Sequence, residues 1–145
     1  MNHNPKLNAS GCMDMTAYKA IQKVDRNKNT GTHGNPEPQK VYICSPFAGD
    51  TETNVENALK YCRFALCKGK FPIAPHCYLP RFMDDNIPAE RELALSFGLQ
   101  LLNGCREIWI FGSRISEGMK REILNARRKN IRIRQFNENL KEISL

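Results

Sequence analysis

The sequence lacks the features of a membrane-spanning, secreted or disulfide-rich protein. No stretch approaches the roughly 18–20 apolar residues that a membrane span needs. Residues 1–10 have neither the basic start nor the apolar run of a secretory signal. The chain contains no C-x-x-C pair, internal repeat or low-complexity tract. We therefore expect a cytoplasmic protein without a membrane partner.

The cysteines that are present are predicted to be free, mostly buried thiols. Cys44 ends an apolar run, Cys62 lies on the apolar face of a predicted helix, and Cys105 precedes another apolar run. Small disulfide scaffolds usually carry more cysteine per residue. His76 and Cys77 are adjacent, which is poor geometry for chelation, and no second metal-binding pair follows. We expect no metal and no cofactor.

The charge balance is basic, with 22 Lys and Arg against 15 Asp and Glu and a net charge of +7. Such a balance suits an anionic partner, either nucleic acid or a phosphorylated small molecule. A basic cluster on a predicted helix end and the following strand is typical of nucleic-acid binding. However, helix C-termini favour cations in any case, and no aromatic residues are interleaved with these charges. Nucleic acid is therefore not the expected partner. The cluster is Arg127, Arg128, Lys129, Arg132 and Arg134.

The length of 145 residues fits one domain with its own core. Residues 1–39 differ in composition from the rest: a short helix is plausible over 14–24, and 25–39 are rich in Asn, Gly, Pro and Thr, as linkers are. We expect an N-terminal helical arm and linker over 1–39 and an α/β domain over 40–145.

Short apolar runs alternate with helical patterns from residue 40 onward. Thr53 and Glu56 have capping-box spacing, Gly69 is a typical helix end, and Pro88 is a typical first helical residue. The alternation predicts a parallel sheet of four to five strands flanked by helices, as in Rossmann-like or flavodoxin-like folds. The expected strands are 40–45, 71–75, 107–112 and 130–135, and the expected helices are 53–69, 89–103 and 116–129.

The predicted helix over 89–103 is apolar on nearly every side, so it is expected to be heavily buried. One face of a small sheet cannot cover such a helix. A surplus apolar surface usually becomes a subunit interface, and we expect a homo-oligomer. The alternative is that the N-terminal arm covers the same surface within one chain.

Ligands of parallel sheets sit beyond the carboxyl ends of the strands, which makes 45–50, 75–85 and 112–119 the candidate site segments. In the first, Ser45 and the following amides could hold a phosphate or sugar, and Phe47 could stack on a base. The same residues also fit an ordinary loop turned by Pro46 and Gly49.

In the second segment, His76 either contacts a phosphate and acts as an acid or base near neutral pH, or is structural. Asp84 and Asp85 either bind ribose hydroxyls or cap the following helix, and Arg91 either pairs with them or holds a phosphate.

In the third segment, Gly112 and Gly118 allow close backbone approach, and Ser116 with the amides of 117–119 forms a potential anion site. Glu122 flanks the apolar face of this helix. The helix dipole would favour its ionised form, which a nucleophile requires. The alternative is a surface glutamate paired with a nearby arginine.

Three segments, YICSPFAGD, PIAPH and WIFGSRISEGMKREILNA, together resemble the nucleoside 2-deoxyribosyltransferase-like superfamily. The resemblance is nearest to its small bacterial and phage branch, which reads Y-I-x-S-P early and S-x-G-M-x-x-E late, and it covers residues 40–136. It implies that Tyr42 to Phe47 opens the ligand site. It also aligns Glu122 with the last residue of the D-x-G-x-x-x-E signature, the glutamate that attacks the anomeric carbon of the sugar. Family members complete their pockets with residues of a neighbouring subunit.

Two of the three acids of that family are absent. Ser116 stands at the first signature position, and Ser96 or a neighbour stands where the preceding helix carries an aspartate. Three functions therefore remain open: cleavage or transfer at an N-glycosidic bond of a nucleoside or nucleotide, non-catalytic binding of a nucleotide signal of the cyclic or ADP-ribose type, and nucleic-acid binding. The expected catalytic residue is Glu122. The expected ligand-binding residues are Tyr42, Ser45, Pro46, Phe47, Asp50, His76, Asp85, Arg91, Gly112, Ser113, Ser116, Gly118 and Met119.

Overall fold

The computed structural model describes residues 37–144. The expected helix over 14–24, and the expected linker as far as residue 36, lie outside the described residues. The strands are β1 (Lys40–Cys44), β2 (Phe71–Ile73), β3 (Glu107–Phe111), β4 (Arg132–Phe136) and β5 (Glu142–Ile143). The helices are α2 (Thr51–Cys67), α3 (Pro88–Asn103), α4 (Glu117–Arg128) and the short 3-10 turns η1 (Pro75–Cys77) and η2 (Leu79–Arg81).

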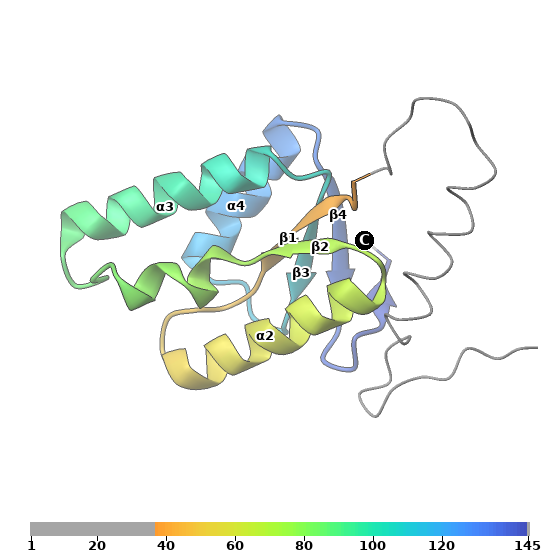
Figure 1. The fold of residues 1–145 in the computed structure, drawn as a ribbon, viewed down its shortest axis with the longest axis horizontal. Coiled ribbons are helices and arrows are strands. Elements are labelled where there is room, and N and C mark those ends of the chain that lie inside the picture. The colour runs from red at the N-terminus through yellow and green to blue at the C-terminus, as the bar shows by residue number, and fades with distance from the viewer. Residues whose placement is uncertain (1–36, 145) are drawn as a thin grey trace, which may run out of the picture. The chain divides into compact units, whose positions relative to one another are not determined.

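The strands form one five-stranded sheet in the order β2-β1-β3-β4-β5. The first four are parallel, in the register Tyr42↔Ile108 between β1 and β3 and Ile108↔Ile133 between β3 and β4. The predicted α/β fold with a parallel sheet and flanking helices is confirmed (Figure 1). The fifth strand pairs antiparallel with β4. It has only two residues, too few to show an apolar alternation in the sequence.

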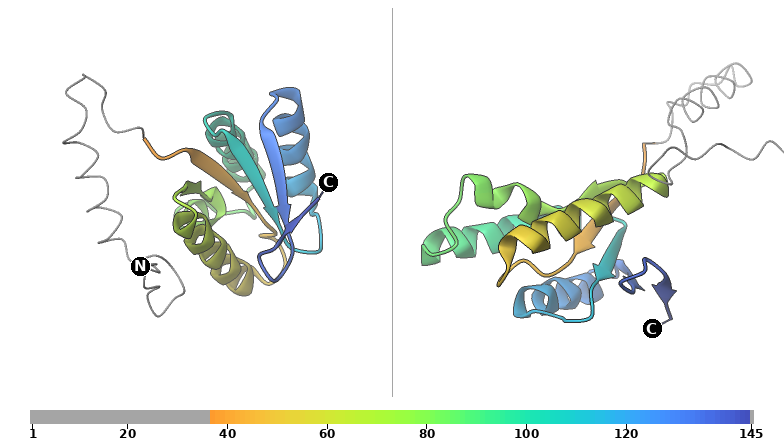
Figure 2. Two further views of the ribbon diagram at one scale, coloured as in Figure 1. Left: turned by 90° about the vertical axis from the view of Figure 1, so that its right-hand side faces the viewer. Right: turned by 90° about the horizontal axis from the view of Figure 1, so that it is seen from below.

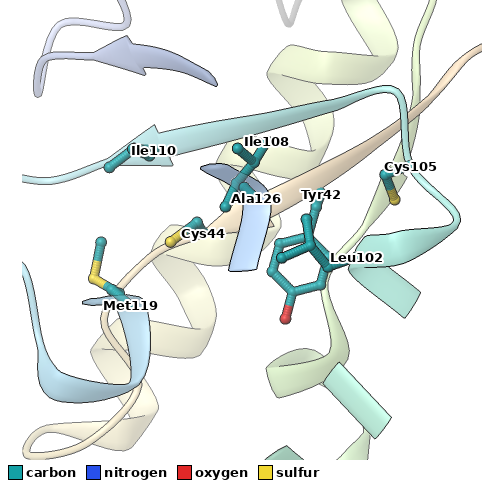
Figure 3. Packing of buried hydrophobic residues seen from close by; sticks show 8 residues of the cluster. All are labelled: Tyr42, Cys44, Leu102, Cys105, Ile108, Ile110, Met119 and Ala126. Atoms are coloured by element: carbon teal, nitrogen blue, oxygen red, sulfur yellow. The ribbon is translucent and has the colours of Figure 1, made fainter. Parts of the chain in front are cut away.

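Helices cover both faces of the sheet, with α2 on one side and α3 and α4 on the other (Figure 2). Residues of β1 and β3 alternate between these layers, as strand geometry requires. The core under α3 and α4 contains Tyr42, Cys44, Leu102, Ile108, Ile110, Met119 and Ala126 (Figure 3). The core under α2 contains Val41, Ile43, Ala65, Trp109, Phe111 and Phe136.

The helix ends follow the expected capping residues with one exception. Pro88 begins α3, Ser116 caps α4 by accepting a hydrogen bond from the Met119 amide, and Gly69 follows α2 with a φ of +70°. Helix α2, however, begins two residues before Thr53. The Asp50 carboxylate is its cap, because it accepts hydrogen bonds from both the backbone amide and the hydroxyl of Thr53.

The expectation that α3 is heavily buried is wrong within one chain. Only Gly98 and Leu102 are fully buried, whereas Leu93 is 47% exposed and Phe97 is 36% exposed. The physical reason is that the sheet and α4 cover one side of a helix whose apolar residues surround its axis. The surplus apolar surface from which we predicted a subunit interface is therefore present on α3.

The cysteines follow the prediction in most of the described region. Cys44, Cys62, Cys77 and Cys105 are free thiols, and two of them, Cys44 and Cys105, are buried. Cys67 instead participates in a disulfide, so the expectation of a free thiol is wrong at that position. None of the helices described here is long and apolar enough to cross a membrane.

Candidate functional site

The strand order creates a crevice between the ends of β1 and β3. The connection from β1 enters α2 on one face, whereas the connection from β3 enters α4 on the other, so the chain diverges at this point. Open α/β sheets bind ligands at such switch points. The loops 45–50 and 112–116 meet here, with Pro46 beside Gly112, whose φ of +94° favours glycine.

Two cavities adjoin this crevice. The larger, here called the main cavity, has a volume of about 730 Å³ and lies between the η1–η2 segment, α3 and α4. Ten predicted site residues line it, together with apolar side chains such as Leu79, Met83, Leu95 and Leu99. The ten are Tyr42, Ser45, Phe47, His76, Asp85, Arg91, Ser116, Gly118, Met119 and Glu122.

The second, here called the side cavity, has a volume of about 660 Å³ and lies toward the start of α2. The remaining predicted residues, Pro46, Asp50, Gly112 and Ser113, line this cavity and not the main one. The two cavities share Ser45, Ala48 and Ser116. The structure therefore distributes the predicted site over two adjacent cavities.

The Glu122 carboxylate lies in the main cavity and is held there by Tyr42, which is 80 positions away in the chain. The Tyr42 hydroxyl donates a hydrogen bond of 2.7 Å to Oε1 of Glu122, and Tyr42 is only 1% exposed. The Cys44 thiol also lowers the pKa of Glu122. Tyr42 and Cys44 both project from β1 toward α3 and α4 (Figure 3). The alternative of a surface glutamate paired with Arg121 is not what the structure shows, because Arg121 faces Glu92 at 3.9 Å.

The electrostatics of Glu122 differ from the expectation. Burial raises the pKa of its carboxyl above the usual value, and Tyr42 and Cys44 only partly oppose this effect. Glu122 lies beyond the first turn of α4, where the influence of the helix dipole has faded. Desolvation therefore dominates, and the argument that the helix end keeps this group ionised is wrong.

Ser45 and His76 form a second polar pair in the main cavity. The Ser45 Oγ and His76 Nε2 atoms lie 3.0 Å apart, and the Phe47 ring lies 6.4 Å from the imidazole between centroids. Burial lowers the pKa of His76 to about 4. The expectation that His76 titrates near neutral pH is therefore wrong: the imidazole is neutral at pH 7 and serves as a hydrogen-bonding group.

The acidic residues before α3 do not cap it. Asp84 accepts hydrogen bonds from the amide and side chain of Asn86, and the α3 cap position is Ile87, which has no side-chain hydrogen bond. Asp85 and Arg91 both line the main cavity. Neither takes part in an ion pair within residues 37–144.

Three predicted ligand-binding residues have structural roles as well. The Asp50 carboxylate caps α2, and the Ser116 hydroxyl caps α4. The Met119 side chain is 2% exposed and belongs to the core.

The sequence did not reveal Asn54, whose side-chain amide donates to the carbonyls of Phe47 and Ala48 and fixes the loop after β1. Its position one turn into α2 is the signal that could have indicated a loop contact. Among the described residues, no three His, Cys, Asp or Glu side chains gather where a metal ion could be held.

The basic cluster is partly neutralised by acidic neighbours. Arg134 makes a 2.7 Å ion pair with Glu142 and lies 3.5 Å from Glu107 and 5.0 Å over the ring of Trp109. Arg132 lies 3.6 Å from Glu107. Two of the five basic residues, Arg132 and Arg134, therefore already pair with acidic side chains of the same chain.

Comparisons with known proteins place this geometry in context. The structure is similar to a 2-deoxyribosyltransferase from the psychrotolerant bacterium Bacillus psychrosaccharolyticus, with a TM-score of 0.54 and 16% identity over 72% of this chain and 77% of that chain. At that identity the similarity shows a shared fold. No curated protein matches the sequence. A protein family described as "Domain of unknown function (DUF7768)" matches residues 39–136, which is most of the chain, and the protein therefore belongs to the DUF7768 family.

Proposed function

We propose that this protein binds a nucleoside or nucleotide in the main cavity and cleaves or transfers at its N-glycosidic bond, with Glu122 as the nucleophile. The observation that carries the proposal is the partly buried Glu122 carboxylate, held by the Tyr42 hydroxyl at 2.7 Å within a cavity of about 730 Å³. The similarity in fold to a 2-deoxyribosyltransferase supports the same reaction class.

The cavity suits a ligand with a flat apolar part and a polar part. Small-molecule sites are typically about 300–1,000 Å³, mostly apolar, with a few polar groups that fix orientation. Phe47, Leu79 and Met83 provide apolar surface for a base. Ser45, His76 and Arg91 line the same cavity and offer hydroxyl, imidazole and guanidinium groups for a sugar or its phosphate.

In the proposed reaction, Glu122 attacks the anomeric carbon while the bond from that carbon to the base breaks. The electron pair of that bond leaves with the base, which takes up a proton. Water or a second base then attacks the same carbon and releases the carboxylate. The Tyr42 hydroxyl orients the nucleophile, and partial desolvation strengthens its interaction with the positive charge that develops on the sugar.

A specific observation favours non-catalytic binding as the second candidate. Ser116 replaces an acid of the similar family, and its hydroxyl accepts a hydrogen bond as the α4 cap. The Ser96 hydroxyl, which also lines the main cavity, accepts one from Gln100. Neither hydroxyl can protonate a departing base as a carboxylic acid does, whereas a binding protein needs no such donor.

The deciding experiment incubates the protein with a panel of nucleosides and nucleotides, then separates the supernatant and the denatured protein by chromatography. We expect released base, and we expect Glu122→Gln to abolish its release while retaining the fold. Glu56→Gln is the matched control, because Glu56 is exposed on α2 and lines neither cavity. Intact ligand retained by wild type would establish the binding function, and full activity of Glu122→Gln would exclude the covalent mechanism.

We also propose that the protein is a homo-oligomer, because Leu93 and Phe97 leave apolar surface uncovered on α3. Light scattering coupled to size exclusion should give more than one chain per particle, and Leu93→Glu should lower that number. A monomeric wild-type protein would contradict the proposal.

A further inference from the structure

The charged side chains that line the main cavity are mostly acidic, although the chain as a whole is basic. Six carboxylates line the cavity, against two guanidinium groups, Arg91 and Arg121. The carboxylates belong to Asp84, Asp85, Glu90, Glu92, Glu117 and Glu122. The whole chain, by contrast, has a net charge of +7. The cavity walls therefore carry charge of the opposite sign to the composition of the chain.

Ion pairs within the chain do not remove this acidic excess. Glu117 pairs with Lys120 at 2.5 Å, and Glu92 lies 3.9 Å from Arg121. Arg91 is the one lining guanidinium without an acidic partner among residues 37–144. Apart from the proposed nucleophile, three lining carboxylates have no cationic partner in that range: Asp84, Asp85 and Glu90. Because a cleft with apolar walls strengthens the field of the charges that line it, the cavity favours a cation over an anion.

Besides the nucleophile, the described residues of this cavity offer no acid for the proton that a neutral base takes up as it leaves. Ser96 and Ser116 line the cavity with hydroxyls, which are not acids at neutral pH. His76 lies 3.0 Å from Ser45, and burial lowers its pKa to about 4, so its imidazole is neutral at pH 7. Carboxyl groups open to water are ionised at neutral pH, because their usual pKa values are about 4. A base that is already positively charged needs no such proton.

We propose that the main cavity takes nucleosides whose base is positively charged at the glycosidic nitrogen, of which a pyridinium riboside is the simplest. The carboxylates of Asp84, Asp85 and Glu90 attract the cationic ring. Phe47 lines the same cavity and provides an aromatic face that a cation can contact. The reaction part of this inference rests on the proposed function, whereas the preference for a cation is measurable as binding.

A cationic base changes the balance of the proposed reaction. The Glu122 carboxylate forms a bond to the anomeric carbon, and the bond from that carbon to the ring nitrogen breaks. The electron pair of the broken bond stays on the nitrogen and cancels its positive charge, so the base leaves as a neutral molecule. Water then attacks the anomeric carbon, frees the carboxylate and releases one proton to the solvent. No step requires the protein to protonate the base.

The test compares two ribosides of nearly the same shape that differ in charge. Nicotinamide riboside has the cationic ring nitrogen, whereas benzamide riboside has a neutral carbon in its place and has no N-glycosidic bond to cleave. Binding of both to Glu122→Gln is measured by isothermal titration calorimetry, since this variant should not turn over the first. We expect nicotinamide riboside to bind at least about tenfold more tightly, the equivalent of about 1.4 kcal/mol.

Salt and a single carboxylate test the electrostatic cause of this preference. Raising the salt from about 0.1 M to about 1 M shortens the screening length from about 10 Å to about 3 Å. It should weaken binding of nicotinamide riboside and leave that of benzamide riboside nearly unchanged. Asp85→Asn, added to Glu122→Gln, should weaken binding several-fold with the same selectivity. Glu56→Gln is the matched control in the same background, because Glu56 is exposed on α2 and lines neither cavity.

The wild-type protein gives an independent measurement. It should accelerate release of nicotinamide from nicotinamide riboside, relative to the rate in buffer alone, by a larger factor than release of hypoxanthine from inosine, a neutral nucleoside. Comparison with the rate in buffer is needed because the bond to a cationic base is also weaker in water.

Three results would overturn the proposal. They are no measurable binding of nicotinamide riboside, binding of both ribosides with the same affinity and salt dependence, and release of hypoxanthine accelerated as strongly as release of nicotinamide. The proposed function fails in a different way. Preferential binding of the cation without release of any base would contradict the proposed reaction and leave the cation preference standing, whereas release without that preference would do the reverse.

Discussion

The two faces of the sheet use the same strands for different purposes. Under α2, stacked aromatic rings close the core: Phe111 lies 4.2 Å from Tyr61 and 5.1 Å from Phe136 between ring centroids. Under α3 and α4, the core contains a phenol, a thiol and a carboxylate beside a cavity. Alternation along β1 produces both faces, because Tyr42 and Cys44 point one way and Val41 and Ile43 the other. We infer that the α2 face mainly supplies stability and the opposite face mainly supplies the site.

The largest expected effect concerns stability on the α2 face. Trp109 is fully buried, and its indole donates a 2.6 Å hydrogen bond to Glu107. Trp109→Ala should lower the free energy of unfolding by about 3–5 kcal/mol, the usual range for a large aromatic side chain removed from a core. Denaturant melts measure this, with Leu59→Ala on the exposed side of α2 as the control. If Trp109→Ala does not fold, Trp109→Phe keeps most of the packing and should still lose about 1.5–3 kcal/mol, because the hydrogen bond to the Glu107 carboxylate is removed.

The next effect concerns activity on the opposite face. Tyr42→Phe retains the ring and removes the hydrogen bond to Glu122. Such a bond to a charged group contributes about 1.5–3 kcal/mol, so kcat/KM should fall about ten- to a hundredfold. Because this bond lowers the pKa of Glu122, its loss should also move the acid limb of the pH–rate profile to higher pH. Tyr78→Phe is the control, because Tyr78 is exposed and lines neither cavity. An acid limb that moves to lower pH would contradict the assignment.

A smaller effect links stability to pH. The folded-state pKa of Glu122 is raised by burial, so the unfolded chain releases this proton first as pH rises. Wild type should therefore lose stability relative to Glu122→Gln as pH rises from the ordinary glutamate pKa through the raised one, and the difference should then level off. Melts of both proteins between pH 4 and about pH 8, well above the usual glutamate range, measure it. A wild-type protein that gains stability relative to Glu122→Gln as pH rises would show that burial does not dominate at Glu122.

The smallest effect probes the boundary between core and site. A Cβ atom at Gly98 on α3 would lie 3.2 Å from the Tyr42 hydroxyl, so the hydroxyl must shift slightly. Gly98→Ala should change the free energy of unfolding by less than about 1 kcal/mol, because the gain in helix propensity offsets the crowding. Activity should fall a few-fold, because a shifted Tyr42 hydroxyl orients the Glu122 carboxylate less well. Gly104→Ala, where the added atom makes an ordinary contact with Leu101, should leave activity unchanged.

The helices, strands and most of the candidate site were predictable because their signals are local. Apolar runs give the strands, and Pro88, Ser116 and Gly69 mark helix ends through backbone requirements that hold in any fold. The resemblance of the segment from Ser116 to Glu122 to the D-x-G-x-x-x-E signature singled out the carboxylate that the structure places in the main cavity. The start of α2 was misplaced because Asp50 and Thr53 both have capping chemistry, and only the three-dimensional structure shows which one caps.

The sequence by itself determined a parallel α/β fold and the segments that gather at the carboxyl ends of its strands, because periodicity and turn chemistry act over a few residues. Only the tertiary structure decided which side chains meet. The pairs Tyr42–Glu122 and Ser45–His76 each join separate elements. It also decided the direction in which the pKa values of Glu122 and His76 are shifted, since burial is the main cause of both shifts. Burial depends on how helices cover the sheet, and no local pattern encodes that arrangement.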